Sequence, residues 1–309
     1  MSLAGGLLLL LILHLLIIPD GALSATAAAA GRGCQRRCGG LLVPYPFGFS
    51  GSCPIKLACN ESSATPAALM VSSSTSEEAA ADRSPYTVVR FNATASTFVV
   101  SLPPSCDRTV SGARRWLAGA NYGVSSRTGL FLRGCLNATT TNCSVPVETM
   151  LRTTRCGNET STSSSSSSSS LTCVASLSAD STAAAAAAAA GRGEGLFMKW
   201  ERVEEPRCGN LMTSVYGDTR DGVFSLEFAM AEMGWWVNGS CSNHTAGGSG
   251  GGVDDLGRCA ANATCVPVQT PTGEWAHRCE CLPGMDGDGF AAGEGCFFSV
   301  ERFGKKFEK

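Results

Sequence analysis

The sixteen cysteines of this 309-residue chain constrain its fold more than any other feature. In an exported protein, such a number predicts a disulfide framework, because small extracellular modules bury too little apolar surface to be stable without cross-links. The alternative interpretation of these cysteines is that they bind structural zinc. However, the one Cys-x-Cys step, Cys279 and Cys281, has no partner pair at zinc-finger spacing, and His244 and His277 are the only histidines after the N-terminal apolar run. We therefore expect no metal and no cofactor.

The N-terminus predicts export. The run from Leu7 to Ile18 is apolar except for His14, and it ends at Pro19-Asp20-Gly21. Small residues follow, so that residues 1–24 fit a cleaved signal peptide. The run is shorter than the roughly 20 residues of a spanning helix, and no later segment approaches that length. The mature chain is expected to be secreted, to lie outside the cell or in the cell wall, and to contain no membrane span.

Eight Asn-x-Ser/Thr sequons agree with export, although a chain rich in Ser and Thr also forms sequons by chance. We exclude Asn142, because Cys143 at its middle position is expected to form a disulfide. A modified asparagine has to lie on the surface. The predicted N-glycosylation sites are Asn60, Asn92, Asn137, Asn158, Asn238, Asn243 and Asn262.

Short β-rich runs alternate with turn residues along the ordered parts of the chain, and no long stretch has a helical period. The expected fold class is small, disulfide-rich and mainly β. Unbroken serine and alanine tracts interrupt the chain and are expected to form no core. The expected division is a Cys-rich domain at 31–160, a low-complexity insertion at 161–195, a β-rich segment at 196–240, a Cys module at 241–296 and a charged tail at 297–309.

The C-terminal Cys module has the most specific spacing. It reads Cys259-x5-Cys265-x13-Cys279-x-Cys281-x14-Cys296, with Cys241 ahead of it. Six cysteines allow 15 connectivities. The pattern resembles an EGF-like module, and this resemblance implies the disulfides Cys241–Cys265, Cys259–Cys279 and Cys281–Cys296.

Calcium binding is not expected in this module. Calcium-binding EGF-like modules carry acidic residues just before the first cysteine, whereas residues 235–240 contain none. Asp286 and Asp288 lie among glycines, and we interpret them as turn residues rather than ligands.

The other end of the chain carries a second signature. Cys34-Gln-Arg-Arg-Cys38-Gly-Gly precedes Pro44-Tyr-Pro-Phe-Gly48, then Cys53 and Cys59. This pattern resembles the galacturonan-binding domain of plant wall-associated receptor kinases, and the stretch 224–241 that leads into the EGF-like module also resembles that family. Kinase motifs are not found: there is no H-R-D-type catalytic loop and no D-F-G. The resemblance therefore implies the extracellular part of such a receptor, whose full-length relatives would be single-pass plasma-membrane proteins.

Charge is distributed unevenly along the chain. Residues 31–160 contain 13 Lys and Arg against 7 Asp and Glu, whereas residues 194–309 contain 10 against 17. Twelve of the 13 basic residues are Arg, whose planar guanidinium matches a carboxylate through two hydrogen bonds. A polymer of uronic acids presents one carboxylate per sugar. The candidate polysaccharide contacts are Arg36, Arg37, Arg114, Arg115, Arg127 and Arg133, although any single one is more often a solvated surface residue.

These features predict a non-catalytic, extracellular binding protein for an acidic, galacturonan- or pectin-type cell-wall polysaccharide. The alternative is a protein–protein interaction module that acts as a soluble decoy or co-receptor for the ectodomains of full-length receptor kinases. An enzyme is disfavoured, since a glycosidase needs paired carboxylates, and Asp107 and Glu148 have no motif around them. Export and the mixture of positive and negative charges argue against a nucleic-acid-binding function.

Overall fold

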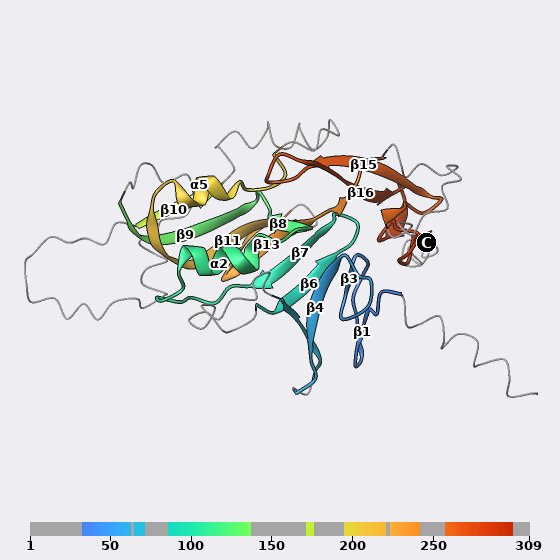
Figure 1. The fold of residues 1–309 in the computed structure, drawn as a ribbon, viewed down its shortest axis with the longest axis horizontal. Helices are drawn as coiled ribbons and strands as arrows, with labels where there is room; N and C mark the ends of the chain where they lie inside the picture. Colours follow the sequence, from blue (N-terminus) through green and yellow to red (C-terminus); the bar gives the residue numbers. More distant parts are fainter. Residues whose placement is uncertain are drawn as a thin grey trace, which may run out of the picture.

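The computed structural model describes residues 33–62, 65–71, 86–136, 171–175, 195–220, 223–241 and 257–298. The predicted signal peptide, both low-complexity tracts and residues 299–309 lie outside the described residues, as do Asn137, Asn158 and Asn243. The prediction of a disulfide-rich, mainly β fold is confirmed: the described strands form six small sheets (Figure 1). No helix among the described residues is long and apolar enough to span a membrane.

The first module, residues 33–71, combines two small sheets with two disulfides, Cys34–Cys53 and Cys38–Cys59. Gly48, the last residue of the Pro-Tyr-Pro-Phe-Gly signature, has no space for a side chain, because a Cβ there would overlap the Cys53 sulfur. Its strands are β1 (Arg37–Cys38), β2 (Leu41–Leu42), β3 (Phe47–Gly48), β4 (Ile55–Asn60) and β5 (Ala67–Met70).

Two four-stranded sheets form the centre of the molecule. The first has the order β6-β7-β13-β8, and the second has the order β10-β9-β11-β12. The first sheet contains β6 (Val88–Asn92), β7 (Thr97–Ser101), β13 (Met230–Trp235) and β8 (Tyr122–Val124). The second contains β10 (Leu171–Ala175), β9 (Thr128–Cys135), β11 (Cys208–Arg220) and β12 (Val223–Phe228).

Both central sheets are built from two distant parts of the chain. β13 pairs with β7 and β8, β11 pairs with β9, and the disulfide Cys135–Cys208 joins the same two regions. Residues 86–136 and 195–235, which the sequence suggests as parts of separate segments, therefore share their sheets and one apolar core.

Two short helices accompany the second sheet, α2 (Val110–Leu117) and α5 (Trp200–Glu204). Thr109 caps α2 by accepting a hydrogen bond from the Gly112 N–H at 3.0 Å, which satisfies one of the free donors of the first turn. Val110, Ala113 and Leu117 face the core.

Aromatic side chains connect the first module to the central core. The Phe47 ring is fully buried and makes edge-on contacts with Phe91, Phe98 and Trp235, with ring centroids 4.8 to 5.0 Å apart. Such contacts contribute about 0.5–1.5 kcal/mol each beyond the area that they bury. The Tyr-Pro-Phe-Gly signature thus supplies a core residue.

The EGF-like module follows β13 directly. β14 (Val237–Asn238), β16 (Trp275–Cys281) and β15 (Ala263–Gln269) form its main sheet, and β17 (Met285–Gly287) and β18 (Cys296–Phe298) form its last hairpin. Its disulfides are Cys241–Cys265, Cys259–Cys279 and Cys281–Cys296, the pairing that the EGF-like resemblance implies.

The EGF-like module packs against the first module through Asp288. This carboxylate is buried and accepts the backbone N–H of Tyr45 at 3.2 Å, while the Tyr45 ring lies 5.1 Å from that of Phe290. Burial, with a smaller contribution from Asp288, raises the pKa of Tyr45. Asp288 is thus a structural residue of a turn and of the contact between modules.

Candidate functional site

The face of the first central sheet opposite the core carries several polar side chains, because successive residues of β7 and β13 alternate between its two faces. Phe98, Val100 and Met233 point into the core, whereas the intervening positions carry Thr97, Val99 and Glu232 on the opposite face. Arg90 pairs with Val99 across the β6–β7 hairpin, and Asn92 pairs with Thr97. Residues that pair across neighbouring strands have their side chains next to each other, so these polar side chains lie close together.

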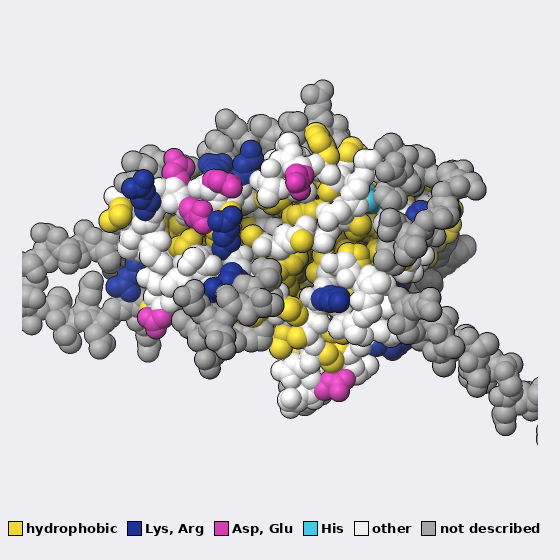
Figure 2. All heavy atoms as spheres, in the orientation of Figure 1, with side chains coloured by type: hydrophobic (Ala, Val, Ile, Leu, Met, Phe, Trp, Pro, Cys, Tyr) yellow, Lys and Arg dark blue, Asp and Glu magenta, His cyan; other side chains and the backbone are white. Residues whose placement is uncertain are grey.

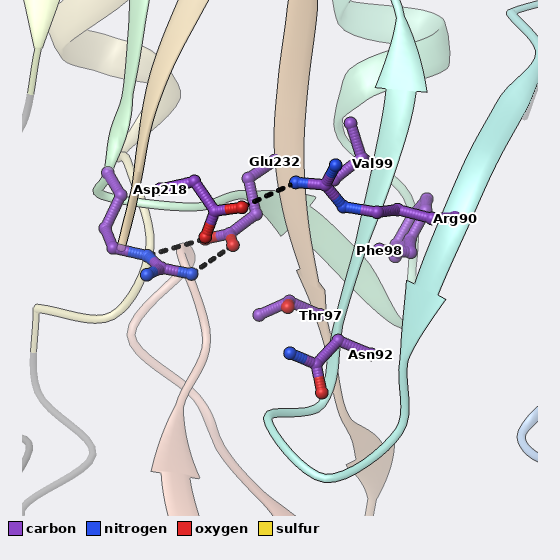
Figure 3. A pocket seen from close by; sticks show the side chains of 8 residues that line it. Arg90, Asn92, Thr97, Phe98, Val99, Asp218 and Glu232 are labelled. Atoms are coloured by element: carbon purple, nitrogen blue, oxygen red, sulfur yellow. Dashed lines mark hydrogen bonds and ion pairs between the residues drawn. The ribbon is translucent and has the colours of Figure 1, made fainter. Parts of the chain in front are cut away.

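These side chains line an open pocket of about 140 Å³ (Figure 3). Its lining includes Arg90, Asn92 and Thr97 of the hairpin, Glu232 of β13, Asp218 of β11, and Arg127 of the turn between β8 and β9.

Arg127 and Glu232 form one wall of the pocket. The Arg127 Nε donates to Glu232 Oε1 at 2.9 Å, and its Nη2 donates to the other carboxylate oxygen. Glu232 is buried, whereas 44% of the Arg127 side chain is exposed. A two-point pair of this kind fixes the plane of the guanidinium and uses its Nε and Nη2 groups.

Arg90 forms the opposite wall. Its Nη2 donates to Asp218 at 3.0 Å, its Nη1 donates to Glu227 at 3.1 Å, and its guanidinium carbon lies 5.4 Å from the centre of the Tyr216 ring. The two guanidinium groups of the pocket are therefore held by three carboxylates.

Arg278 of the EGF-like module is buried close behind this face. Its Nε donates to the Trp235 carbonyl at 2.9 Å, and its guanidinium lies 5.2 Å from the centre of the Phe197 ring. Burial lowers the pKa of Arg278 to about 10, against the opposing influence of Glu280 and Glu232. This residue joins the EGF-like module to the central sheet.

The six predicted polysaccharide contacts do not form one described cluster. Arg36 faces the EGF-like module, 3.7 Å from Asp288 and 3.9 Å from Glu294. Arg127 lies in the pocket, and Arg133 is half-buried on β9. Arg37 is exposed on β1.

Arg114 and Arg115 share α2, where Arg114 pairs with Glu204 of α5 at 2.9 Å. Figure 2 shows basic and acidic side chains interspersed over the part of the surface where α2 and α5 lie.

Every ion pair between described residues joins a basic residue of 31–160 to an acidic residue of 194–309. The pairs are Arg36–Asp288, Arg36–Glu294, Arg90–Asp218, Arg90–Glu227, Arg114–Glu204 and Arg127–Glu232. Several basic residues of the first part and acidic residues of the second part thus neutralise each other within the folded protein. Arg90 and its acidic partners have no local motif, and only their pairing in space identifies them.

Arg37 and Lys56 differ from these paired residues. Both are exposed on the first module, Arg37 on β1 and Lys56 on β4, and neither forms an ion pair with a described residue. Arg36, which precedes Arg37 in the chain, has a side chain that is only 19% exposed and faces the EGF-like module.

The described residues offer one grouping of potential metal ligands, Cys38, Cys59 and Glu61. Cys38 and Cys59 form a disulfide, so their sulfurs are not thiolate ligands. His277 lies with its ring nitrogens 3.0 and 2.8 Å from the carbonyl oxygens of Gly239 and Gly257, inside the EGF-like module rather than in the pocket.

Two curated proteins of Arabidopsis thaliana are homologues of the chain. It is 27% identical to "Wall-associated receptor kinase-like 14" over 265 residues, which are 83% of this chain and 30% of that protein. It is 23% identical to "Wall-associated receptor kinase-like 21" over 265 residues, 84% of this chain and 33% of that protein. The resemblance to the wall-associated receptor kinase family is confirmed, and the chain spans about one third of the length of these relatives. No family model and no solved structure matches the chain.

Proposed function

We propose that this homologue of wall-associated receptor kinase-like proteins is a receptor-like, non-catalytic extracellular domain that binds an acidic, galacturonan-type polysaccharide, and that its first module makes the contact. The observation that carries the proposal is the exposure of Arg37 and Lys56, without an ion partner among the described residues, on the module that bears the Cys-Gly and Tyr-Pro-Phe-Gly signature.

The paired arginines are less suited to this role. A uronate that binds Arg36, Arg114 or Arg127 has to compete with a carboxylate already held by the same guanidinium. In contrast, a uronate that binds Arg37 or Lys56 meets no competing carboxylate from the described residues. Single exposed ion pairs contribute roughly 0–1 kcal/mol, so the expected affinity is weak for one sugar and rises through repeated carboxylates on a polymer.

Binding of the secreted, glycosylated protein to immobilised de-esterified polygalacturonan, over a salt series and beside a neutral glucan, tests the proposal. We expect selective binding that weakens as salt is raised, because exposed charges are screened. The double variant Arg37→Ala, Lys56→Ala should lose most of the binding, whereas Arg114→Ala, which removes an arginine that is also exposed but paired, should retain it. Equal binding by both variants, or no binding to polygalacturonan at low salt, would contradict the proposal.

A second candidate function is the binding of a receptor-kinase ectodomain through the EGF-like module. Leu282, Phe297 and Phe298 are exposed near the last hairpin, with 45%, 46% and 66% of their surface accessible. Exposed aromatic side chains are frequent anchors in protein interfaces. Retained binding to such an ectodomain in a protein without affinity for polygalacturonan, and its loss in Phe297→Ser, Phe298→Ser, would favour this function.

A further inference from the structure

We propose that the pocket on the outer face of β6, β7 and β13 binds the first sugar of the chain's own glycan, which is attached to Asn92. The residues of this pocket differ from the proposed polysaccharide contacts, Arg37 and Lys56, so a negative result with polygalacturonan would not affect the glycan site.

The position of Asn92 is the first argument. Asn92-Ala93-Thr94 is a sequon at the end of β6, where the chain turns into β7, and Asn92 is exposed. Its Oδ1 accepts the backbone N–H of Ala95 at 3.1 Å, which fixes the rotation of the amide. The Nδ2 atom, to which a glycan would be linked, is directed toward the pocket that Asn92 itself helps to line (Figure 3).

The charge of the pocket is the second argument, because it selects a neutral sugar. Two guanidinium groups, those of Arg90 and Arg127, meet the carboxylates of Asp218, Glu227 and Glu232. The lining of the pocket itself carries two cations, Arg90 and Arg127, and two carboxylates, Asp218 and Glu232, and each cation is already paired with a carboxylate, so a uronate would find no unpaired positive charge there. The first sugar of an N-linked glycan is N-acetylglucosamine, which carries no charge.

The remaining hydrogen-bonding groups are the third argument. No described residue bonds the Thr97 hydroxyl, the Arg127 Nη1 or the Arg90 Nε. These groups are held in fixed positions by the hairpin and by the two ion pairs, so a sugar would meet preorganised donors. The volume of about 140 Å³ corresponds to several water molecules, which one sugar ring would displace.

Site-resolved glycosylation of the secreted protein tests the inference. Glycopeptide mass spectrometry gives the occupancy of each sequon, and release by a peptide-N-glycosidase under native conditions gives the accessibility of each glycan. Asn262 provides the matched control, because it is an exposed sequon in a turn of the EGF-like module. We expect Asn92 to be occupied and its glycan to be released about tenfold or more slowly than that of Asn262, with equal rates after denaturation.

Thr97→Val distinguishes a glycan whose first sugar binds in the pocket from a glycan that is only sterically shielded from the enzyme. It removes the hydroxyl while keeping the β-branched shape that the strand favours, so it should bring the native release rate at Asn92 close to that at Asn262. An unmodified Asn92, or equal native rates in the original protein, would overturn the inference. A rate at Asn92 that stays slow in Thr97→Val would also overturn it, as would an external neutral sugar in the pocket of the glycosylated protein.

Discussion

Asp288→Asn should weaken the contact between the EGF-like module and the first module, and the hydrogen bonds of the carboxylate define the expected size of the effect. Asp288 is only 2% exposed. Oδ1 accepts the backbone N–H of Phe290 and Gly295, both at 3.1 Å. Oδ2 accepts the backbone N–H of Glu294 at 2.9 Å and of Tyr45 at 3.2 Å.

An asparagine at this position keeps the volume but offers one acceptor oxygen and one amino group. Because each carboxylate oxygen accepts two N–H groups, either orientation of the amide leaves two backbone donors facing another donor. A buried donor without a partner costs about 1–3 kcal/mol, so the expected loss is about 2–6 kcal/mol. That is a large part of the roughly 5–15 kcal/mol by which a folded protein is stable.

Urea denaturation at 25 °C of the secreted, disulfide-intact protein, followed by tryptophan fluorescence, measures this loss. The matched control is Asp286→Asn, two residues earlier, since the half-buried Asp286 carboxylate forms no hydrogen bond among the described residues. The control should change the free energy of unfolding by less than about 0.5 kcal/mol. A loss of less than about 1 kcal/mol for Asp288→Asn relative to Asp286→Asn would refute the reasoning.

Three further predictions follow from burial and pairing. Phe47→Ala should cost about 3–5 kcal/mol, because it empties a fully buried aromatic position, and secretion yield with chemical denaturation would reveal it. Arg127→Ala should cost about 3–5 kcal/mol because it leaves the buried Glu232 unpaired, whereas Arg114→Ala at an exposed pair should cost less than about 1 kcal/mol; the same denaturation assay compares them. Burial raises the pKa of Tyr122 to about 12 from 10.0, so the neutral phenol is favoured in the folded state and ionisation favours the unfolded state. The free energy of unfolding should therefore be unaffected by Tyr122 well below pH 10 and fall as the pH rises above it, by up to about 1.4 kcal/mol per pH unit. Tyr122→Phe should reduce this slope, and an unchanged slope would contradict the assignment.

The EGF-like module shows how much of a fold can be predicted from the spacing of cysteines that are close in the sequence. The six cysteine positions and the Cys-x-Cys step are enough to recognise the module, because its disulfides join residues only 15 to 24 positions apart in the sequence. The signature at Pro44–Gly48 is similarly local and supports the family resemblance, and the structure shows that its Phe47 is a buried core residue. Local features such as these can be predicted without knowledge of the rest of the fold.

The central sheets show where prediction from the sequence stops. The strand at 223–228 and the β-rich run at 97–102 are recognisable one by one, but no property of either run identifies its partner strand. β13 lies between β7 and β8 although more than 100 residues separate it from either. Strand pairing over such distances depends on the whole core, so the joining of residues 86–136 with 195–235 required the structure.

The amino-acid sequence alone established that this is a cysteine-rich protein with a basic first part, residues 31–160, and an acidic second part, residues 194–309. Only the tertiary structure decided what the charges do. Each ion pair between described residues crosses from one part to the other, so three of the six predicted arginine contacts, Arg36, Arg114 and Arg127, are engaged in ion pairs, and Arg37 and Lys56 are left exposed on the first module. The physical reason is the short range of charge pairing in water: a net charge counted along the chain sums residues regardless of position, whereas an ion pair requires atoms within about 4 Å, a proximity that folding alone creates.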